Sequence, residues 1–359
     1  MRVLSLFDGI SCGQVALERA GIPVEVYYAS EIDKYAIQVT QKNYPNTIQL
    51  GDVTKIDFTQ FIGKIDLLIG GSPCQDLSIA GTRKGLSGER SGLFYKFVEA
   101  LEIIKPKYFL LENNVGMPQE AYEEISRLMG CYPIEINSAL VSAQNRKRYY
   151  WTNIGDKNYN LFGFPTCAIP QPENKGLVIK NVLEENVDKK YYLSNKRAER
   201  FIPKIGINTW GTVKFREDSI GQRDIIYNID KKIGCLTDTD YKSAKLILEP
   251  INVGSIGKNV QGQRVYSING KSITVTAGNG GGRQIWILID DKKYIIRKVT
   301  PLECERLQTL PDNYTNCLCD TQRYCSIGNG WTVDVIAHIF KHILDTKKNV
   351  LYIEFEVIK

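Results

Sequence analysis

The chain has 359 residues, of which 43% are hydrophobic and 24% are charged, and its formal net charge is +6. This composition is typical of a globular protein and excludes the disordered and fibrous classes, while the length predicts two domains or one large domain with an insertion. No apolar run approaches the ~20 residues that span a bilayer, so we expect no membrane segment. Asp8 and Gly9 interrupt the N-terminal segment too early for a secretory signal. The nine cysteines cannot all pair and lie far apart, which favours reduced thiols and a cytoplasmic protein.

The positive charge is concentrated in the middle of the chain. Residues 156–295 contain 22 Lys and Arg against 15 Asp and Glu, whereas the remainder contains 24 against 25. This excess has two interpretations: a solvated basic surface, or a module that binds a polyanion and is inserted into a neutral catalytic body.

The first 155 residues alternate apolar runs with helical patterns. The apolar runs predict strands at residues 3–7, 24–29, 65–69, 108–111, 133–138 and 148–153. Helical spacing predicts helices at residues 13–20, 34–44, 93–104 and 119–129, and Asp33 is the expected cap of the second helix. This alternation predicts an α/β fold with a mostly parallel sheet and helices on both faces.

The rest of the chain divides into two further parts. Residues 156–295 have weak periodicity and short alternating runs such as 272–276, which predict irregular β structure. The glycine-rich tract 277–283 is unsuited to the interior of a regular element. From residue 296 onward helical patterns return, with one helix opened by Pro301 and another at 331–344. We therefore expect domains at 1–155 and 156–295, and a C-terminal part at 296–359 that returns to the first domain.

Several candidate functional residues follow the predicted strands, where doubly wound sheets bind their ligands. The loop after the first strand contains only two glycines, Gly9 and Gly13, and lacks a full Gly-x-Gly-x-x-Gly motif. It is therefore weak support for binding of a dinucleotide pyrophosphate. Glu31 is placed to accept hydrogen bonds from ribose hydroxyls, and Asp52 to accept one from an adenine amino group. A nucleoside without phosphates therefore fits this edge better than a phosphorylated one.

Three residue types at the same edge form a chemical set. Cys74 follows a buried strand and Pro73; a cysteine there is more often a small buried hydrophobe than a nucleophile. Glu112 alone is consistent with an exposed strand-end carboxylate or a helix N-cap, and the run 144–148 with a solvated basic turn. Together, a thiolate can add to an electron-poor ring, an acid can protonate a ring nitrogen, and arginine can hold a carbonyl or phosphate.

The chain resembles the DNA (cytosine-5) methyltransferases that depend on S-adenosylmethionine. The matching stretches occur in the order of that family: Leu6-Phe7-Asp8-Gly9-Ile10-Ser11-Cys12-Gly13, Gly70-Gly71-Ser72-Pro73-Cys74-Gln75-Asp76-Leu77-Ser78, Glu112-Asn113-Asn114, Gln144-Asn145-Arg146-Lys147-Arg148, Thr300-Pro301-Leu302-Glu303-Cys304-Glu305-Arg306-Leu307-Gln308 and Ile327-Gly328-Asn329-Gly330-Trp331. The Ser-Pro-Cys variant and the Gly-x-x-Trp ending are most similar to vertebrate de novo methyltransferases and their phage or bacterial relatives. Asn114 departs from the family, which usually has valine there.

The resemblance implies a Rossmann-like S-adenosylmethionine-dependent methyltransferase fold with a smaller, irregular, β-containing target-recognition domain. It implies transfer of a methyl group to C5 of a flipped-out cytosine in a specific duplex DNA sequence, with S-adenosylhomocysteine as the product. The implied catalytic residues are Cys74 as the nucleophile at C6, Glu112 at N3 and the exocyclic amine, and Arg146 and Arg148 at the base.

The resemblance also assigns binding residues. The implied cofactor-binding residues are Phe7, Asp8, Gly9, Gly13, Glu31, Ile32, Asp52, Val53, Pro73, Asn329 and Trp331. The expected DNA-binding residues are Gln75, Ser78, Arg83, Arg283 and Gln284. The last two suit guanine and adenine edges; the alternative is that residues 278–282 form a hairpin turn and Arg283 is a phosphate contact or a solvent-exposed charge.

Alternative functions are an RNA cytosine-5 methyltransferase and a catalytically inert DNA-binding homologue. The basic insert favours duplex DNA over RNA, and the presence of Cys74 and Glu112 argues against an inert protein. We expect no metal site, because Cys317, Cys319 and Cys325 lack a Cys-x-x-Cys pair. We further expect a monomeric, bacterial or phage-encoded enzyme, with any cognate restriction endonuclease acting separately.

Overall fold

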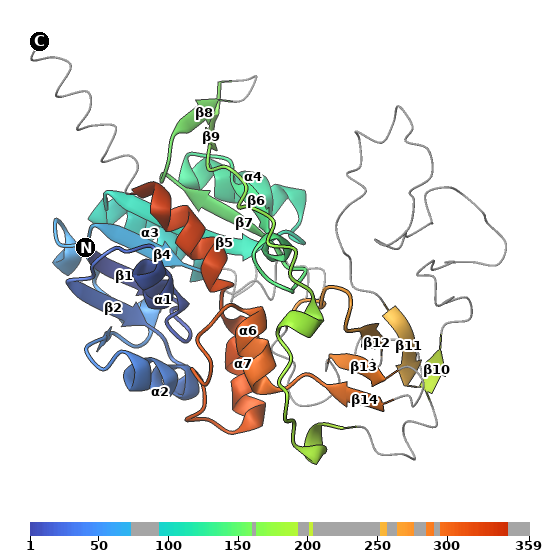
Figure 1. Ribbon diagram of the computed structural model, residues 1–359. Coiled ribbons are helices and arrows are strands. Elements are labelled where there is room, and N and C mark those ends of the chain that lie inside the picture. The colour runs from blue at the N-terminus through green and yellow to red at the C-terminus, as the bar shows by residue number, and fades with distance from the viewer. Residues whose placement is uncertain are drawn as a thin grey trace, which may run out of the picture.

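The computed structural model describes residues 1–72, 93–159, 163–192, 201–203, 252–256, 264–275, 285–290 and 295–343. Within these ranges the chain forms a large sheet, a smaller five-stranded sheet and a separate two-stranded hairpin (Figure 1). No helix of the described ranges has the length and apolar character that a membrane span needs.

The large sheet has seven strands in the order β3-β2-β1-β4-β5-β7-β6. Five strands are parallel: β1 (Arg2–Leu6), β2 (Val26–Ser30), β3 (Ile48–Gln49), β4 (Leu67–Gly70) and β5 (Tyr108–Asn114). At the β5 edge, β7 (Lys147–Thr152) runs antiparallel to β5, and β6 (Ile134–Asn137) runs antiparallel to β7. The predicted α/β fold is confirmed, and the order places β1 and β4 side by side at its centre.

Helices cover both faces of this sheet, because neighbouring residues of a strand point to opposite sides. Val3, Ile69 and Leu110 belong to one buried cluster, whereas their neighbours Leu4, Leu68 and Leu111 belong to another. The first cluster includes residues of α1 (Cys12–Arg19), α2 (Lys34–Asn43) and the helical residues 333–343. The second includes residues of α3 (Phe94–Ile104) and α4 (Gln119–Met129).

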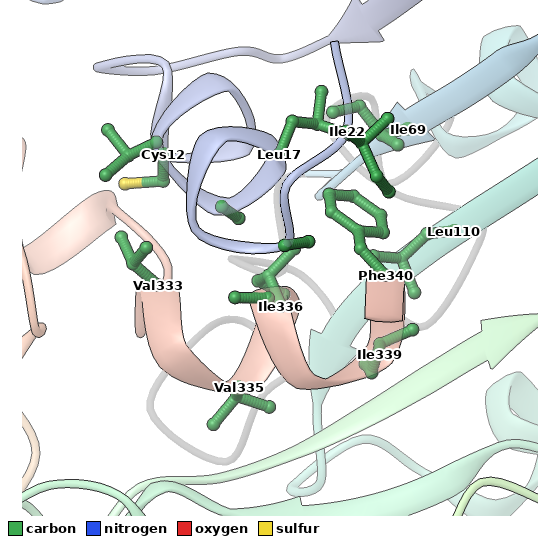
Figure 2. Close-up of a cluster of buried hydrophobic side chains, with 14 of the residues drawn as sticks. Cys12, Leu17, Ile22, Ile69, Leu110, Val333, Val335, Ile336, Ile339 and Phe340 are labelled. Atoms are coloured by element: carbon green, nitrogen blue, oxygen red, sulfur yellow. The ribbon is translucent and has the colours of Figure 1, made fainter. Parts of the chain in front are cut away.

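The C-terminal helix completes the core of the first domain. Figure 2 shows Val333, Ile336 and Phe340 of residues 333–343 facing α1, with Ile69 and Leu110 of the sheet beside Phe340. All of these side chains have no measurable exposure. Residues 333–343 therefore pack against the N-terminal sheet, and the return of the whole C-terminal part, 296–359, to the first domain stays a prediction.

The predicted elements agree with the structure to within two or three residues at most ends. Asp33 caps α2 as expected, because its side chain accepts a hydrogen bond from the backbone N–H of Tyr35. One helix was not predicted: α7 (Asp320–Asn329) follows a run of turns, and only three residues near its C-terminal end are buried. Its weak apolar stripe explains why periodicity did not reveal it.

The second sheet has five strands in the order β10-β11-β12-β13-β14. Their bounds are Phe201–Pro203, Asn252–Ile256, Arg264–Ser267, Trp286–Asp290 and Ile295–Lys298. Its residues Tyr266 and Ile287 pack in one cluster with Leu307 of α6 (Pro301–Leu307) and Ile327 of α7. The two sheets are thus linked through the C-terminal helices, and the domain boundaries at 155 and 295 stay predictions.

A backbone seam also joins the two parts. The Asn145 N–H donates to the Ser272 carbonyl at 2.8 Å, and the Ser272 N–H donates to the Ala143 carbonyl at 2.7 Å. The Thr274 hydroxyl adds a bond of 2.9 Å to the Asn145 carbonyl. This seam places residues 271–275 of the middle segment directly beside the start of β7.

Candidate functional site

Several of the predicted functional residues that the structure describes lie at the carboxyl edge of the large sheet. Residues 7–9 follow β1, Glu31 follows β2, and Gly71 and Ser72 follow β4. Glu112 lies within β5, two residues before its C-terminal end. The turn after β1 is tight, since Phe7, Gly9 and Ser11 all have φ between 56° and 60°. Such values are uncommon for residues other than glycine and mark a strongly constrained backbone.

Glu31 organises the first part of this edge. Its carboxylate accepts backbone N–H bonds from Gly9 at 2.8 Å, Ile32 at 2.7 Å and Asp33 at 2.9 Å. A carboxylate has about four acceptor positions, so a further donor such as a ribose hydroxyl still has a place. The Ile32 side chain beside it is 76% exposed and offers an apolar surface. This combination suits a sugar diol next to a flat base.

Asp8 and Gly13 occupy the tightly packed floor of the same loop. Asp8 accepts a hydrogen bond from the Tyr27 hydroxyl at 2.7 Å and another from the Ser11 hydroxyl. Burial of this carboxyl raises its pKa to about 6. A Cβ on Gly13 would lie 2.5 Å from Ile69 Cδ1 and 2.8 Å from the Tyr27 hydroxyl, so a larger residue here would displace these side chains.

Asp52 and Val53 differ in what they offer a ligand. Asp52 caps a short 3-10 helix, and its Oδ1 accepts bonds from the Thr54 N–H at 2.9 Å and hydroxyl at 2.8 Å. These bonds lower the pKa of Asp52 and keep it charged. Val53 packs in the hydrophobic core, so its predicted contact with a cofactor is not tested by this arrangement.

Glu112 is enclosed rather than exposed. Its side chain is 11% exposed and forms an ion pair of 2.8 Å between Oε1 and Nε of Arg148. The Trp331 indole N–H donates to Oε2 at 3.2 Å. Antiparallel pairing of β5 with β7 brings the arginine within reach, since Arg148 is opposite Asn114. The interpretation of Glu112 as a solvated strand-end carboxylate is therefore wrong.

The chain leaving β4 passes very close to this carboxylate. A Cβ on Gly71 would lie 2.9 Å from Trp331 Nε1 and 3.0 Å from Glu112 Oε2, which only glycine avoids. The next residue, Ser72, is buried and accepts a hydrogen bond from the Asn113 side chain at 3.1 Å. Ser72 precedes Cys74 by two residues, so the predicted nucleophile follows the segment that contacts Glu112.

Arg146 has a different environment from Arg148. It is 5% exposed, and its guanidinium donates to the backbone carbonyls of Val275 and Gly330, both at 3.1 Å. Arg146 thus joins the middle segment to the loop after α7, and its predicted contact with the base stays a prediction. Sequence reasoning missed this joining role, because its carbonyl partners have no signature in the sequence.

Trp331 lies between the two halves of the site. Its ring carbon Cζ3 is 3.7 Å from the position of a Gly13 Cβ, and its nitrogen contacts Glu112. The neighbouring Asn329 ends α7 and is exposed. The sequence predicted Trp331 only as a wall of the cofactor pocket, so its bond to Glu112 is a new feature.

Seven predicted site residues lie outside the described residues. They are Pro73, Cys74, Gln75, Ser78, Arg83, Arg283 and Gln284.

The C-terminal cysteines and histidines form no evident metal centre. Within the described ranges, no three His, Cys, Asp or Glu side chains come close enough to hold a metal ion. His338 hydrogen-bonds the Pro170 carbonyl at 2.7 Å, and His342 hydrogen-bonds the His338 carbonyl at 3.0 Å.

Comparison with known proteins assigns a family to this site. Residues 1–345 match the family model described as C-5 cytosine-specific DNA methylase. The orphan methyltransferase M.SPRI of Bacillus phage SPR is 28% identical, with 97% of this chain and 98% of the relative aligned. The type II methyltransferase M.HhaI of Haemophilus parahaemolyticus is 26% identical over 96% of this chain and 94% of its own.

Solved structures share the fold. The S. pombe Dnmt2 methyltransferase superposes with a TM-score of 0.62 at 16% identity, and covers 96% of this chain and 99% of its own. The Entamoeba histolytica methyltransferase EhMeth gives 0.64 at 17% identity over 96% and 98%.

Proposed function

The chain belongs to the C-5 cytosine-specific DNA methylase family, and on that premise we propose that it methylates C5 of a flipped-out cytosine in a specific duplex DNA sequence through covalent addition of Cys74 to C6. The observation that carries this proposal is the enclosed Glu112 carboxylate. Arg148 and Trp331 hold it, and the chain passes over it at Gly71 on the way to Cys74.

The proposed reaction begins with two events on the cytosine ring. The Cys74 thiolate forms a bond to C6 while Glu112 delivers a proton to N3, so the electrons that leave the C5–C6 bond make C5 nucleophilic. Because Glu112 is fixed by the Arg148 guanidinium and the Trp331 indole, its second role is to orient the base. Loss of the C5 proton after methylation restores the double bond and expels Cys74.

The residues around Glu31 fit the cofactor that this family uses. S-adenosylmethionine, when bound, supplies the methyl group. We assign the ribose to Glu31, the adenine face to Phe7 and Ile32, and the adenine amino group to Asp52, with Asp8, Gly9, Gly13 and Trp331 forming the rest of the pocket. The support is the donor set: a rigid carboxylate, an exposed apolar side chain, and a loop from Phe7 to Gly13 without Lys or Arg.

The substrate requires base flipping, because C5 and C6 of a stacked cytosine are inaccessible to a protein nucleophile. We propose that the segment with Gln75, Ser78 and Arg83 contacts the flipped nucleotide, and that Arg283 and Gln284 read bases from the second domain. The basic excess of residues 156–295 supports this division, since phosphate contacts dominate DNA affinity.

The relatives bear the names of orphan and of type II methyltransferases from phages and bacteria. We therefore propose a bacterial or phage enzyme that acts as a monomer in the cytoplasm. A cognate restriction endonuclease, where one exists, would act separately.

The decisive experiment tests Cys74. Cys74→Ala is expected to abolish methyl transfer while the dissociation constant for S-adenosylmethionine changes little, because the thiol acts on the base. DNA with 5-fluorocytosine should trap the wild type covalently, since fluorine cannot leave as a proton does. Cys319→Ser, a change at an exposed cysteine, is the matched control and should be trapped as efficiently as the wild type. Turnover by Cys74→Ala, or absence of an adduct with the wild type, would contradict the proposal.

A further inference from the structure

Two cysteines lie together near the C-terminal end of β7, which is the far end of the β5–β7 pair from Arg148. Cys131 follows α4 directly after Gly130, and Cys167 ends β9 (Pro165–Cys167), which forms a hairpin with β8 (Lys157–Tyr159) (Figure 1). The Tyr132 N–H donates to the Pro165 carbonyl at 2.9 Å, and the Cys167 N–H donates to the Tyr132 carbonyl at 3.3 Å. This short bridge fixes the two cysteine backbones side by side.

Their sulfur atoms converge on one acceptor. Cys131 Sγ lies 3.6 Å and Cys167 Sγ 3.2 Å from the carbonyl oxygen of Thr152, at the end of β7. A side-chain hydrogen bond from Cys131 lowers the pKa of the Cys167 thiol, which favours its thiolate. Burial instead raises the pKa values of Cys12 and Cys304, whose thiols are therefore unreactive by comparison.

The pair is accessible from a small cavity. Cys131 and Cys167 both line a cavity of about 200 Å³, to which Asp156 and Asn153 also contribute. Both cysteines retain part of their surface exposure. A small oxidant such as a peroxide therefore has a route to these sulfur atoms.

We propose that Cys131 and Cys167 are a thiol–disulfide modification site, which a small peroxide oxidises to a reversible intramolecular disulfide. This site is separate from the proposed methyl transfer: neither thiol belongs to the carboxyl edge of the sheet, and the described residues give neither a contact with Glu112 or Glu31.

The chemistry balances with the peroxide as the two-electron oxidant. The Cys167 thiolate attacks one peroxide oxygen, the O–O bond breaks, and Cys167 becomes a sulfenic acid while one water is released. The Cys131 thiolate then attacks the Cys167 sulfur, the S–S bond forms, and the S–O bond breaks. The departing hydroxide takes up one proton and leaves as a second water, so each of the two waters carries one of the two thiol protons. A dithiol reductant reverses the modification by thiol–disulfide exchange.

The disulfide would fasten the β8–β9 hairpin to the turn after α4. It would close a loop between residues 131 and 167 and thereby reduce the freedom of the unfolded chain. The oxidised protein is therefore expected to melt at a higher temperature than the reduced protein.

The test is peptide mapping of the full chain without reduction after treatment with hydrogen peroxide. We expect a linked peptide pair that contains Cys131 and Cys167, a mass 2 Da below the sum of the two thiol peptides for this link, and its disappearance with dithiothreitol. Cys131→Ser and Cys167→Ser should each abolish the link and the rise in melting temperature.

Controls separate this site from general oxidation. Cys319→Ser, at an exposed cysteine of the C-terminal part, should form the link to the same extent as the wild type. Under reducing conditions the two cysteine variants should methylate DNA as the wild type does, which shows that they fold. A wild type that yields only sulfenic or sulfinic acid at Cys167, or that links Cys131 to another cysteine, would overturn the proposal. Because the readout is a peptide link, failure of methyl transfer by Cys74 would leave this test unaffected.

Discussion

At the scale of single residues, the two acidic side chains of the site, Glu112 and Glu31, form different kinds of interaction. Glu112 forms an ion pair with Arg148 where both side chains are at most 15% exposed, so solvent screens the pair only weakly. Glu31 instead accepts hydrogen bonds from three backbone N–H groups, and within the described ranges it forms no ion pair. Glu112 is thus held by a guanidinium and an indole N–H, whereas Glu31 is held by backbone N–H groups.

Glu112→Gln should slow methyl transfer strongly. The amide retains most of the shape but cannot deliver a proton to N3, and positioned acids or bases typically contribute ~10²–10⁴-fold. Single-turnover rates with saturating DNA and S-adenosylmethionine measure this loss. Glu135→Gln, at an exposed carboxylate paired with Lys147, is the matched control and should retain the wild-type rate. Rates for Glu112→Gln within a few-fold of the wild type would assign Glu112 a structural role only.

Glu31→Ala should weaken cofactor binding and affect saturated turnover less. The change removes the expected acceptor for the ribose hydroxyls and also releases the Gly9 N–H, so the loop after β1 loses its anchor. Titration of S-adenosylmethionine should show a raised dissociation constant. Glu25→Ala, at the residue before the opposite end of β2, is the control. An unchanged dissociation constant would contradict the ribose assignment.

At the scale of the elements, the seam between residues 271–275 and the start of β7 includes a buried lysine. Lys271 is 2% exposed, and its Nζ donates to the carbonyls of Ala139 at 2.8 Å and Ser142 at 2.9 Å. Ala139 belongs to a short 3-10 helix, Ser138–Leu140, just before the segment that carries Arg146. Burial lowers the pKa of Lys271 to about 8. The seam is therefore held by an amine that loses its charge near neutral pH.

This lysine makes the stability of the seam depend on pH. Its pKa is lower in the folded chain than in the unfolded chain, so between about pH 8 and pH 10.5 the unfolded state binds more protons. Over that window Lys271 should raise the free energy of unfolding by up to about 3 kcal/mol as the pH rises.

Urea unfolding of the wild type and Lys271→Met at several pH values measures this effect. Met lacks the donors, so the variant should be less stable at every pH, and the difference from the wild type should widen between pH 8 and 10.5. Titration of tyrosines and other lysines cancels in the difference. A difference that stays constant over this range would show that Lys271 does not titrate in the folded chain.

At the scale of the whole molecule, we propose that the chain separates chemistry from recognition. The large sheet and residues 333–343 form the body that carries Glu31 and Glu112, while the basic excess lies in residues 156–295. Arg146 and Lys271 join the two parts through backbone carbonyls, which allows the second part to vary in its surface side chains. On this proposal, a change in the middle segment should alter sequence recognition and leave the carboxyl edge unchanged.

Arg283→Ala tests whether the second domain reads bases at this position. A base contact predicts relaxed preference at one position of the recognition site, with a loss of ~1–3 kcal/mol for the preferred sequence. A phosphate contact predicts equal weakening on all sequences and a smaller salt dependence. Methylation profiling of genomic DNA at two salt concentrations distinguishes the two. An unchanged recognition motif with uniformly weaker binding would reject base reading.

The sequence by itself determined the order of strands and helices in the first domain and the position of its functional residues in that order. Buried strands are apolar, and helices repeat their apolar residues every three or four positions, so Leu67–Gly70 and Gln119–Met129 can be recognised locally. The motif residues were recognised because their types and spacing match a family. α7 was not, because most of its surface is polar and its burial depends on distant partners.

Only the tertiary structure decided which side chains meet. The sequence does not show that Arg148 pairs with Glu112, because that contact requires β7 to run antiparallel beside β5. It does not show that Trp331 reaches the same carboxylate from a position 219 residues later. Nor does it show why Lys271 is buried, since its partners are carbonyl oxygens that every residue possesses. Local periodicity specifies elements, whereas these contacts arise from packing between elements that are far apart in the chain.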